Sequence, residues 1–172
     1  MTVLPDRLRT ASGAALAALG NAARPIAMYS EAGKVGPAYC TGVGKAMLAF
    51  LDEAELKRLL PQQSYHRFTP FTLTTEDELR AELCDIRAQG FAFDREEHEP
   101  GIICVAMPIL TRRGRVLGAL SVTSSTARTD LSGLERLVSV IRPVAERIAA
   151  EAEEWRFPDE TRTKQQTLSA GT

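Results

Sequence analysis

The stretch "IICVAMPILTRRGRVLGALSVTSS", from Ile102 to Ser125, decides the fold of this chain. Its first part, Ile102 to Leu110, is apolar almost without interruption, which is typical of a buried strand. A polar turn follows, in which Gly114 is free to take a positive φ, and a second strand is predicted from Val116 to Ser125. Two strands joined by so short a turn must pair antiparallel.

Helices are predicted on both sides of this hairpin in the sequence. The segment "TTEDELRAELCDIRAQG" begins with a capping box of Thr75 and Glu78 and ends at Gly90. The segment "SGLERLVSVIRPVAERIAAEAEEW" predicts one long amphipathic helix that is capped by Ser132 with Glu135 and kinked at Pro143. Strands and helices do not alternate regularly, so we expect an α+β domain in which helices pack on an antiparallel sheet.

The remaining segments define the expected domain limits. A linker helix is predicted within residues 1–23, with near-helical apolar spacing from Asp6 to about Leu19. A short strand is predicted from Arg24 to Ser30, followed by a glycine-rich turn, "EAGKVGP". We expect the main domain at 24–157 and a polar tail at 158–172.

Composition excludes several classes of protein. The 172 residues carry a formal net charge of −1, so no basic excess marks the chain as a nucleic-acid binder. Three cysteines are an odd number at wide spacing, which favours a reducing compartment, and we expect a cytoplasmic protein. No apolar run is long enough to span a bilayer, so no membrane partner is expected.

The stretch "YCTGVGKAMLAFL", Tyr39 to Leu51, looks like a loop that opens a helix. It lacks the spacing of a phosphate-binding loop, and Ala46 stands where Ser or Thr would hold magnesium. Gly42 and Gly44 would let the backbone approach a ligand, and the free N–H groups of a helix start attract a carboxylate. The alternative is an ordinary, tightly packed helix start.

Other polar residues admit two interpretations each. Asp94, His98 and Cys104 are conceivable as a catalytic set, but Cys104 lies in an apolar strand where inert thiols are common. His66 and His98 match no standard metal-binding spacing, so no metal and no cofactor are expected. Ser121 and Thr123 share one strand face, where they would bind a ligand or line an exposed sheet edge.

Three segments, in the same order and with matching gaps, resemble the effector-binding domain of IclR-family bacterial transcription regulators. They are "YCTGVGKAMLAFL", "RFTPFTLTTEDELRAELCDIRAQGFAFDREEHEPGIICVAMPIL" and "GRVLGALSVTSSTAR". The resemblance covers about Arg24 to Ala149. It implies a GAF-like or profilin-like fold, an antiparallel sheet flanked by helices on both faces, that binds a small organic acid and is not an enzyme.

The resemblance also implies which residues bind the effector. Backbone N–H groups of the glycine segment would meet the ligand carboxylate, and the remaining contacts would come from three strands. The implied residues are Gly42, Val43, Asp94, Ile102, Cys104, Ser121 and Thr123. Thr123 stands where a serine is expected, which adds a methyl group and narrows the pocket.

Full-length members of that family begin with a winged helix-turn-helix, which is absent from this sequence, and usually have a longer first pair of strands. We therefore expect DNA binding only through a winged-helix domain not present here, and assembly as a homodimer or homotetramer. Two other functions stay open: a thiol-dependent enzyme that uses Cys104, and a dimerisation module without a ligand.

Overall fold

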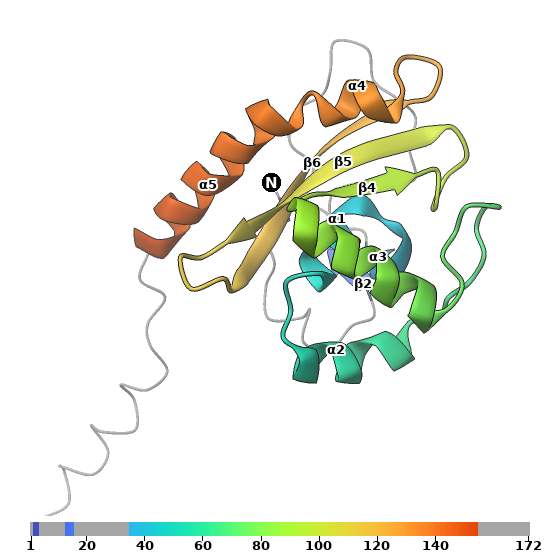
Figure 1. Cartoon of the computed structure of the whole chain (residues 1–172), viewed down its shortest axis with the longest axis horizontal. Helices are drawn as coiled ribbons and strands as arrows, with labels where there is room; N and C mark the ends of the chain where they lie inside the picture. The colour runs from blue at the N-terminus through green and yellow to red at the C-terminus, as the bar shows by residue number, and fades with distance from the viewer. Residues whose placement is uncertain (1, 4–12, 16–34, 155–172) are drawn as a thin grey trace, which may run out of the picture.

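The fold is built on a four-stranded antiparallel sheet with the strand order β1-β6-β5-β4 (Figure 1). The computed structural model describes residues 2–3, 13–15 and 35–154. The strands of the sheet are β1 (Thr2–Val3), β4 (Ala92–Arg95), β5 (Ile102–Leu110) and β6 (Val116–Ser125). The hairpin predicted between Ile102 and Ser125 is confirmed, with Gly114 at φ 77° in its turn.

Helices cover both faces of this sheet, which confirms the predicted α+β fold (Figure 1). On one face lie α4 (Leu131–Glu135) and α5 (Val138–Glu154). On the other face α1 (Gly42–Leu48) packs across β4, β5 and β6, and α3 (Glu76–Gln89) packs on α1. The short helices α2 (Glu53–Leu59), η2 (Ala38–Cys40) and η3 (Leu60–Gln62) complete the layer on the side of α1.

The two faces of the sheet differ in side-chain size, and this difference positions the site. Toward α5 the sheet presents large apolar side chains, among them Ile103, Val105 and Met107. Toward α1 it presents small side chains, namely Ala92, Ala106 and Ala119. Because these side chains are small, the backbone of α1 can approach the sheet closely.

The predicted start and end of α3 are confirmed. The side chain of Thr75 accepts a hydrogen bond from the Glu78 N–H at 3.2 Å, which satisfies one free donor of the first turn. Gly90 follows the helix at φ 82°, a left-handed conformation that glycine adopts without strain.

The single long helix predicted from Ser132 to Trp155 is wrong, because the structure has two helices with a break at Arg136 and Leu137. The cap also lies two residues earlier than predicted, at Asp130 in place of Ser132. Asp130 accepts hydrogen bonds from the Gly133 N–H at 2.7 Å and from the Ser132 hydroxyl at 2.8 Å. Pro143 lies inside α5. The chain bends at the break, where Leu137 N–H bonds to Leu134 C=O in a tighter 3₁₀-type turn.

The prediction for the first part of the chain is wrong where the structure describes it. Gly13–Ala15, inside the predicted helix, forms strand β2, which pairs antiparallel with β3 (Val35–Pro37) in a second, two-stranded sheet. The predicted turn "EAGKVGP" is therefore a strand at its end. The rest of the predicted linker helix, the strand at Arg24–Ser30 and the polar tail lie outside the described residues.

No helix within the described residues is long and apolar enough to cross a membrane.

Candidate ligand-binding site

Residues predicted to bind a ligand lie side by side on the sheet face that is covered by α1. Asp94 on β4 is opposite Cys104 on β5, and Cys104 is opposite Thr123 on β6, so the three form a row across neighbouring strands. Ser121 lies in the next row, opposite Ala106. Directly opposed residues point to the same face of a sheet. This row and its neighbour therefore form one polar surface under the start of α1.

Gly42 brings the start of α1 against this surface. A β-carbon built on Gly42 would overlap the sulfur of Cys104 and would lie 3.3 Å from Ala106 Cβ and 3.5 Å from Asp94 N. Only glycine permits this approach, because any side chain would push the helix away from the sheet. The structure thus joins Gly42, Asp94 and Cys104, which are far apart in the sequence.

The cap of α1 determines which N–H groups remain for a ligand. Thr41 precedes the helix, and its hydroxyl accepts from the Gly44 N–H at 3.3 Å. The side chain of Val43 belongs to the core, where it is 7% exposed, so only the backbone of Val43 is available for the predicted role.

The hydroxyls of Ser121 and Thr123 are free for a ligand. Both residues are half-buried, and in the part of the chain that the structure describes neither side chain has a hydrogen-bond partner. A half-buried hydroxyl gains from a polar partner. Ile102 is the first residue of β5 and is opposite Ser125. It lies on the same face as Cys104, one row further along the sheet.

Asp94 is a buried carboxyl group that titrates near neutral pH. Burial, with a smaller contribution from the charge of Glu97, raises the pKa of Asp94 to about 7, although the Glu97 N–H and Lys45 act in the opposite direction. The Glu97 N–H donates to Asp94 Oδ1 at 2.8 Å. Asp94 is therefore able to hold a proton or release it in the physiological range.

Cys104 does not have the character of a reactive thiol. Burial, together with the negative charge of Asp94, raises its pKa to about 12. Backbone hydrogen bonds from Asp94 and Gly42 lower the pKa by a smaller amount. Because the thiolate is the nucleophile, a thiol with so high a pKa is inert at neutral pH.

A buried ion network beside Asp94 was not predicted from the sequence. Lys45 of α1 is fully buried, and its ammonium lies 3.0 Å from Glu82 Oε1 and 2.5 Å from Glu97 Oε1. Arg95 completes the network, 2.6 Å from Glu82 Oε1. Burial raises the pKa of Glu97, whereas Lys45 lowers it. Glu97 is thus a structural member of the site, although the segment "REEHEPG" looks like a solvated acidic loop.

The loop at residues 63–75 is hydrogen-bonded to the segment "REEHEPG", which carries Glu97. The hydroxyls of Thr69 and Thr72 donate to the carbonyls of Glu96 and Glu97 at 2.7 and 2.6 Å. Phe68 of this loop contacts the ring of His98, with centroids 4.8 Å apart. His98 is therefore packed against the loop, and no group of three or more metal-ligating side chains gathers within the described residues.

Comparison with known proteins matches residues 15–150 to the family model of the bacterial transcriptional regulator IclR C-terminal domain. The HTH-type transcriptional regulator XynR of Escherichia coli is 43% identical over 102 residues, which are 59% of this chain and 40% of XynR. The chain thus spans less than half the length of this relative.

Solved structures show the same fold. The crystal structure of transcriptional regulator YaiJ matches with a TM-score of 0.75 at 30% identity, over 86% of this chain and 83% of that one. The PobR inducer-binding domain from Acinetobacter, solved as a double mutant in complex with 3-hydroxybenzoic acid, matches with a TM-score of 0.62 at 28% identity, over 75% and 73% of the two chains.

Proposed function

Since this chain belongs to the IclR family of bacterial transcriptional regulators, we propose that it is the effector-sensing module of such a regulator and binds a small organic acid. One observation carries the proposal: the hydroxyls of Ser121 and Thr123, which have no hydrogen-bond partner among the described residues, share with Asp94 the sheet face that α1 covers. The complex of PobR with 3-hydroxybenzoic acid supports a carboxylic acid as the class of ligand.

The chemistry of the site narrows the ligand further. Backbone N–H groups of Gly42 and Val43 are suited to a carboxylate, and the strand hydroxyls are suited to donate to it. Asp94 would repel an anion unless it carries a proton or accepts a hydrogen bond from a ligand hydroxyl. We therefore propose an acid that also carries a hydroxyl or a hydrated carbonyl, such as a keto acid or a sugar-derived acid. Binding to protonated Asp94 strengthens as the pH falls through about 7.

The regulatory mechanism requires a second domain. We propose that effector binding changes DNA binding by a winged-helix domain, that the chain works as a homodimer or homotetramer, and that it acts in the cytoplasm. The named relatives are transcriptional regulators rather than enzymes, in agreement with the predicted absence of catalysis. The raised pKa of Cys104 also argues against the thiol enzyme.

A thermal-shift screen with keto acids, sugar acids and aromatic acids tests the proposal. A true effector raises the melting temperature because it binds the folded state by mass action. Titration of the effector into Ser121→Ala should show binding weakened by roughly tenfold, since a hydrogen bond to a charged group is lost. Ser124→Ala is the matched control, because Ser124 is opposite Ile103 on the other face of the sheet.

Two results would contradict the proposal. If no acid stabilises the chain, the ligand-free dimerisation module becomes the better description. If an acid binds Ser121→Ala and the parent equally, the strand hydroxyls do not contact the ligand.

A further inference from the structure

A hollow lies away from the proposed effector site, at the opposite end of β5. It has a volume of about 290 Å³, and its lining comes from the ends of α1 and α3, from β5 and from α5. Its residues are Phe50, Arg87, Gly90, Met107, Pro108, Leu110, Arg142, Ala145 and Glu146. We call this hollow the arginine groove.

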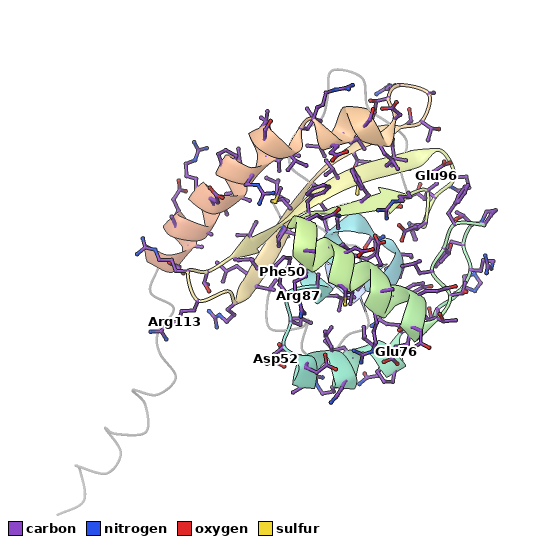
Figure 2. The ribbon with its side chains drawn as sticks, viewed as in Figure 1. Phe50, Asp52, Glu76, Arg87, Glu96 and Arg113 are labelled. Atoms are coloured by element: carbon purple, nitrogen blue, oxygen red, sulfur yellow. The ribbon has the colours of Figure 1, made fainter. Side chains whose placement is uncertain are left out.

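The groove exists because neighbouring strands differ in length. Strand β4 starts at Ala92, opposite Ala106, so β5 runs on past it from Met107 to Leu110. Gly90, which ends α3, leaves room at this point because it has no side chain. The uncovered edge of β5 therefore lines the groove, with Met107 directed toward α5 and Pro108 toward the side of α1. Phe50 lies beside Arg87 at this edge (Figure 2).

Arg87 is held in place by backbone carbonyls and not by an acid. Its Nε donates to Ala49 C=O at 2.6 Å, and its Nη2 donates to Leu51 C=O at 3.3 Å. Among the described residues it forms no ion pair. The guanidinium is thus fixed in direction, and no carboxylate among the described residues pairs with its positive charge.

Arg142 supplies a second cation from α5. A β-carbon built on Gly90 would lie 3.3 Å from Arg142 Nη1 and 3.5 Å from Nη2, so this guanidinium rests against the end of α3. Helix C-termini carry a partial negative charge, which holds a cation there. Within the described ranges Arg142 has no carboxylate partner either, although Glu146 is one turn away on α5.

From these observations we propose that the arginine groove binds a small carboxylate with an apolar body, such as an aromatic acid. Two guanidinium groups face one carboxylate, which leaves the lining with a net positive charge. Guanidinium groups recognise carboxylates through paired N–H donors. The edge of β5, lined by Met107, Pro108 and Leu110, would cover the apolar part of the ligand together with Phe50. A ligand here would contact α3, β5 and α5 together, independently of the effector site.

Benzoate is a suitable probe, followed by amide chemical shifts of the full chain at constant ionic strength. We expect saturable shifts at Gly90 and Leu110. Benzamide, which has the same ring and no charge, should leave both amides unmoved. Arg142→Gln should weaken benzoate binding by roughly tenfold. Arg147→Gln is the matched control: it removes the same charge from α5 at an exposed position outside the groove, and benzoate should bind it like the parent.

Three outcomes would overturn the proposal while leaving the effector site untouched. The first is a response at Gly90 and Leu110 that does not saturate. The second is equal binding by Arg142→Gln and Arg147→Gln. The third is a benzoate response confined to Asp94, Cys104 and Thr123, which would place the aromatic acid in the effector site alone.

Discussion

Asp94 couples the candidate site to pH. Burial raises the pKa of Asp94 to about 7 in the folded chain, whereas the carboxyl group titrates near pH 4 in the unfolded chain. Between about pH 4 and pH 7, Asp94 therefore keeps its proton in the folded chain and has lost it in the unfolded chain. The stabilisation is complete below the unfolded pKa and is lost as the pH rises through about 7. The ligand-free protein should therefore lose unfolding free energy over this range.

Asp94→Asn tests this coupling. Asparagine keeps an oxygen that accepts from the Glu97 N–H and cannot ionise. Urea denaturation at several pH values should show a flatter profile for the variant, and the variant should be more stable than the parent at pH 8 by about 2–4 kcal/mol. The comparison with the parent matters because Glu97 also has a raised pKa and contributes with the same sign. Parallel profiles of parent and variant would show that Asp94 is ionised throughout.

Lys45 is a residue at which burial makes a substitution costly. Lys45→Met keeps a long helix-forming side chain but leaves Glu97, which is 2% exposed, without its cation. We expect a loss of about 3–5 kcal/mol in unfolding free energy. Lys57→Met on exposed α2 is the control and should change stability by less than about 0.5 kcal/mol. The double variant Lys45→Met with Glu97→Gln should recover part of the loss, and no recovery would show that Lys45 acts through packing instead.

At the scale of one helix, the contributions of Asp130 and Ser132 to the cap of α4 can be compared. Asp130 caps α4 by accepting from the Gly133 N–H, so Asp130→Ala should cost about 1 kcal/mol of unfolding free energy. Ser132 only donates its hydroxyl to Asp130, and Ser132→Ala should have a small effect. Chemical denaturation of both variants makes the comparison. If Ser132→Ala is the more costly change, the cap predicted from the sequence is the one that acts in solution.

Elements with a local signal were predicted correctly from the sequence, and those that depend on distant pairing were not. The β5–β6 hairpin and the cap of α3 follow from a turn glycine and from Thr75, which act on their own neighbours. Gly13–Ala15 has helical spacing, but its partner strand begins at Val35, and that pairing overrides local propensity. The break between α4 and α5 was missed because Pro143 offers a more obvious place for a bend.

The same distinction applies to the site. The shared face of its strand residues follows from the pairing of β4, β5 and β6, while their part in ligand binding stays a prediction that the family resemblance implies. The ion network was not predicted, since Lys45 is separated from Glu82 by 37 positions and from Glu97 by 52. The available signal was a lysine directly before the apolar run "AMLAFL", because a buried ammonium requires carboxylate partners.

At the scale of the whole molecule, we expect association between copies of the chain. Helix α5 is amphipathic, yet Val140 on it is 64% exposed, which leaves apolar surface uncovered. Multi-angle light scattering at micromolar concentration should report a dimer or a pair of dimers. Val140→Lys should weaken association, whereas Phe71→Lys, at an exposed loop position away from α5, should not. A monomer at all micromolar concentrations would contradict the expectation.

The unequal burial of the three cysteines has a practical consequence for following this molecule in solution. Cys40 and Cys104 are buried, and burial raises the pKa of both thiols, while Cys84 is exposed on α3. A maleimide fluorophore at neutral pH should therefore attach at Cys84 alone, without any engineered cysteine. Helix α3 packs on α1, and α1 begins at the candidate site. The native sequence therefore already provides a position for an optical reporter of ligand binding.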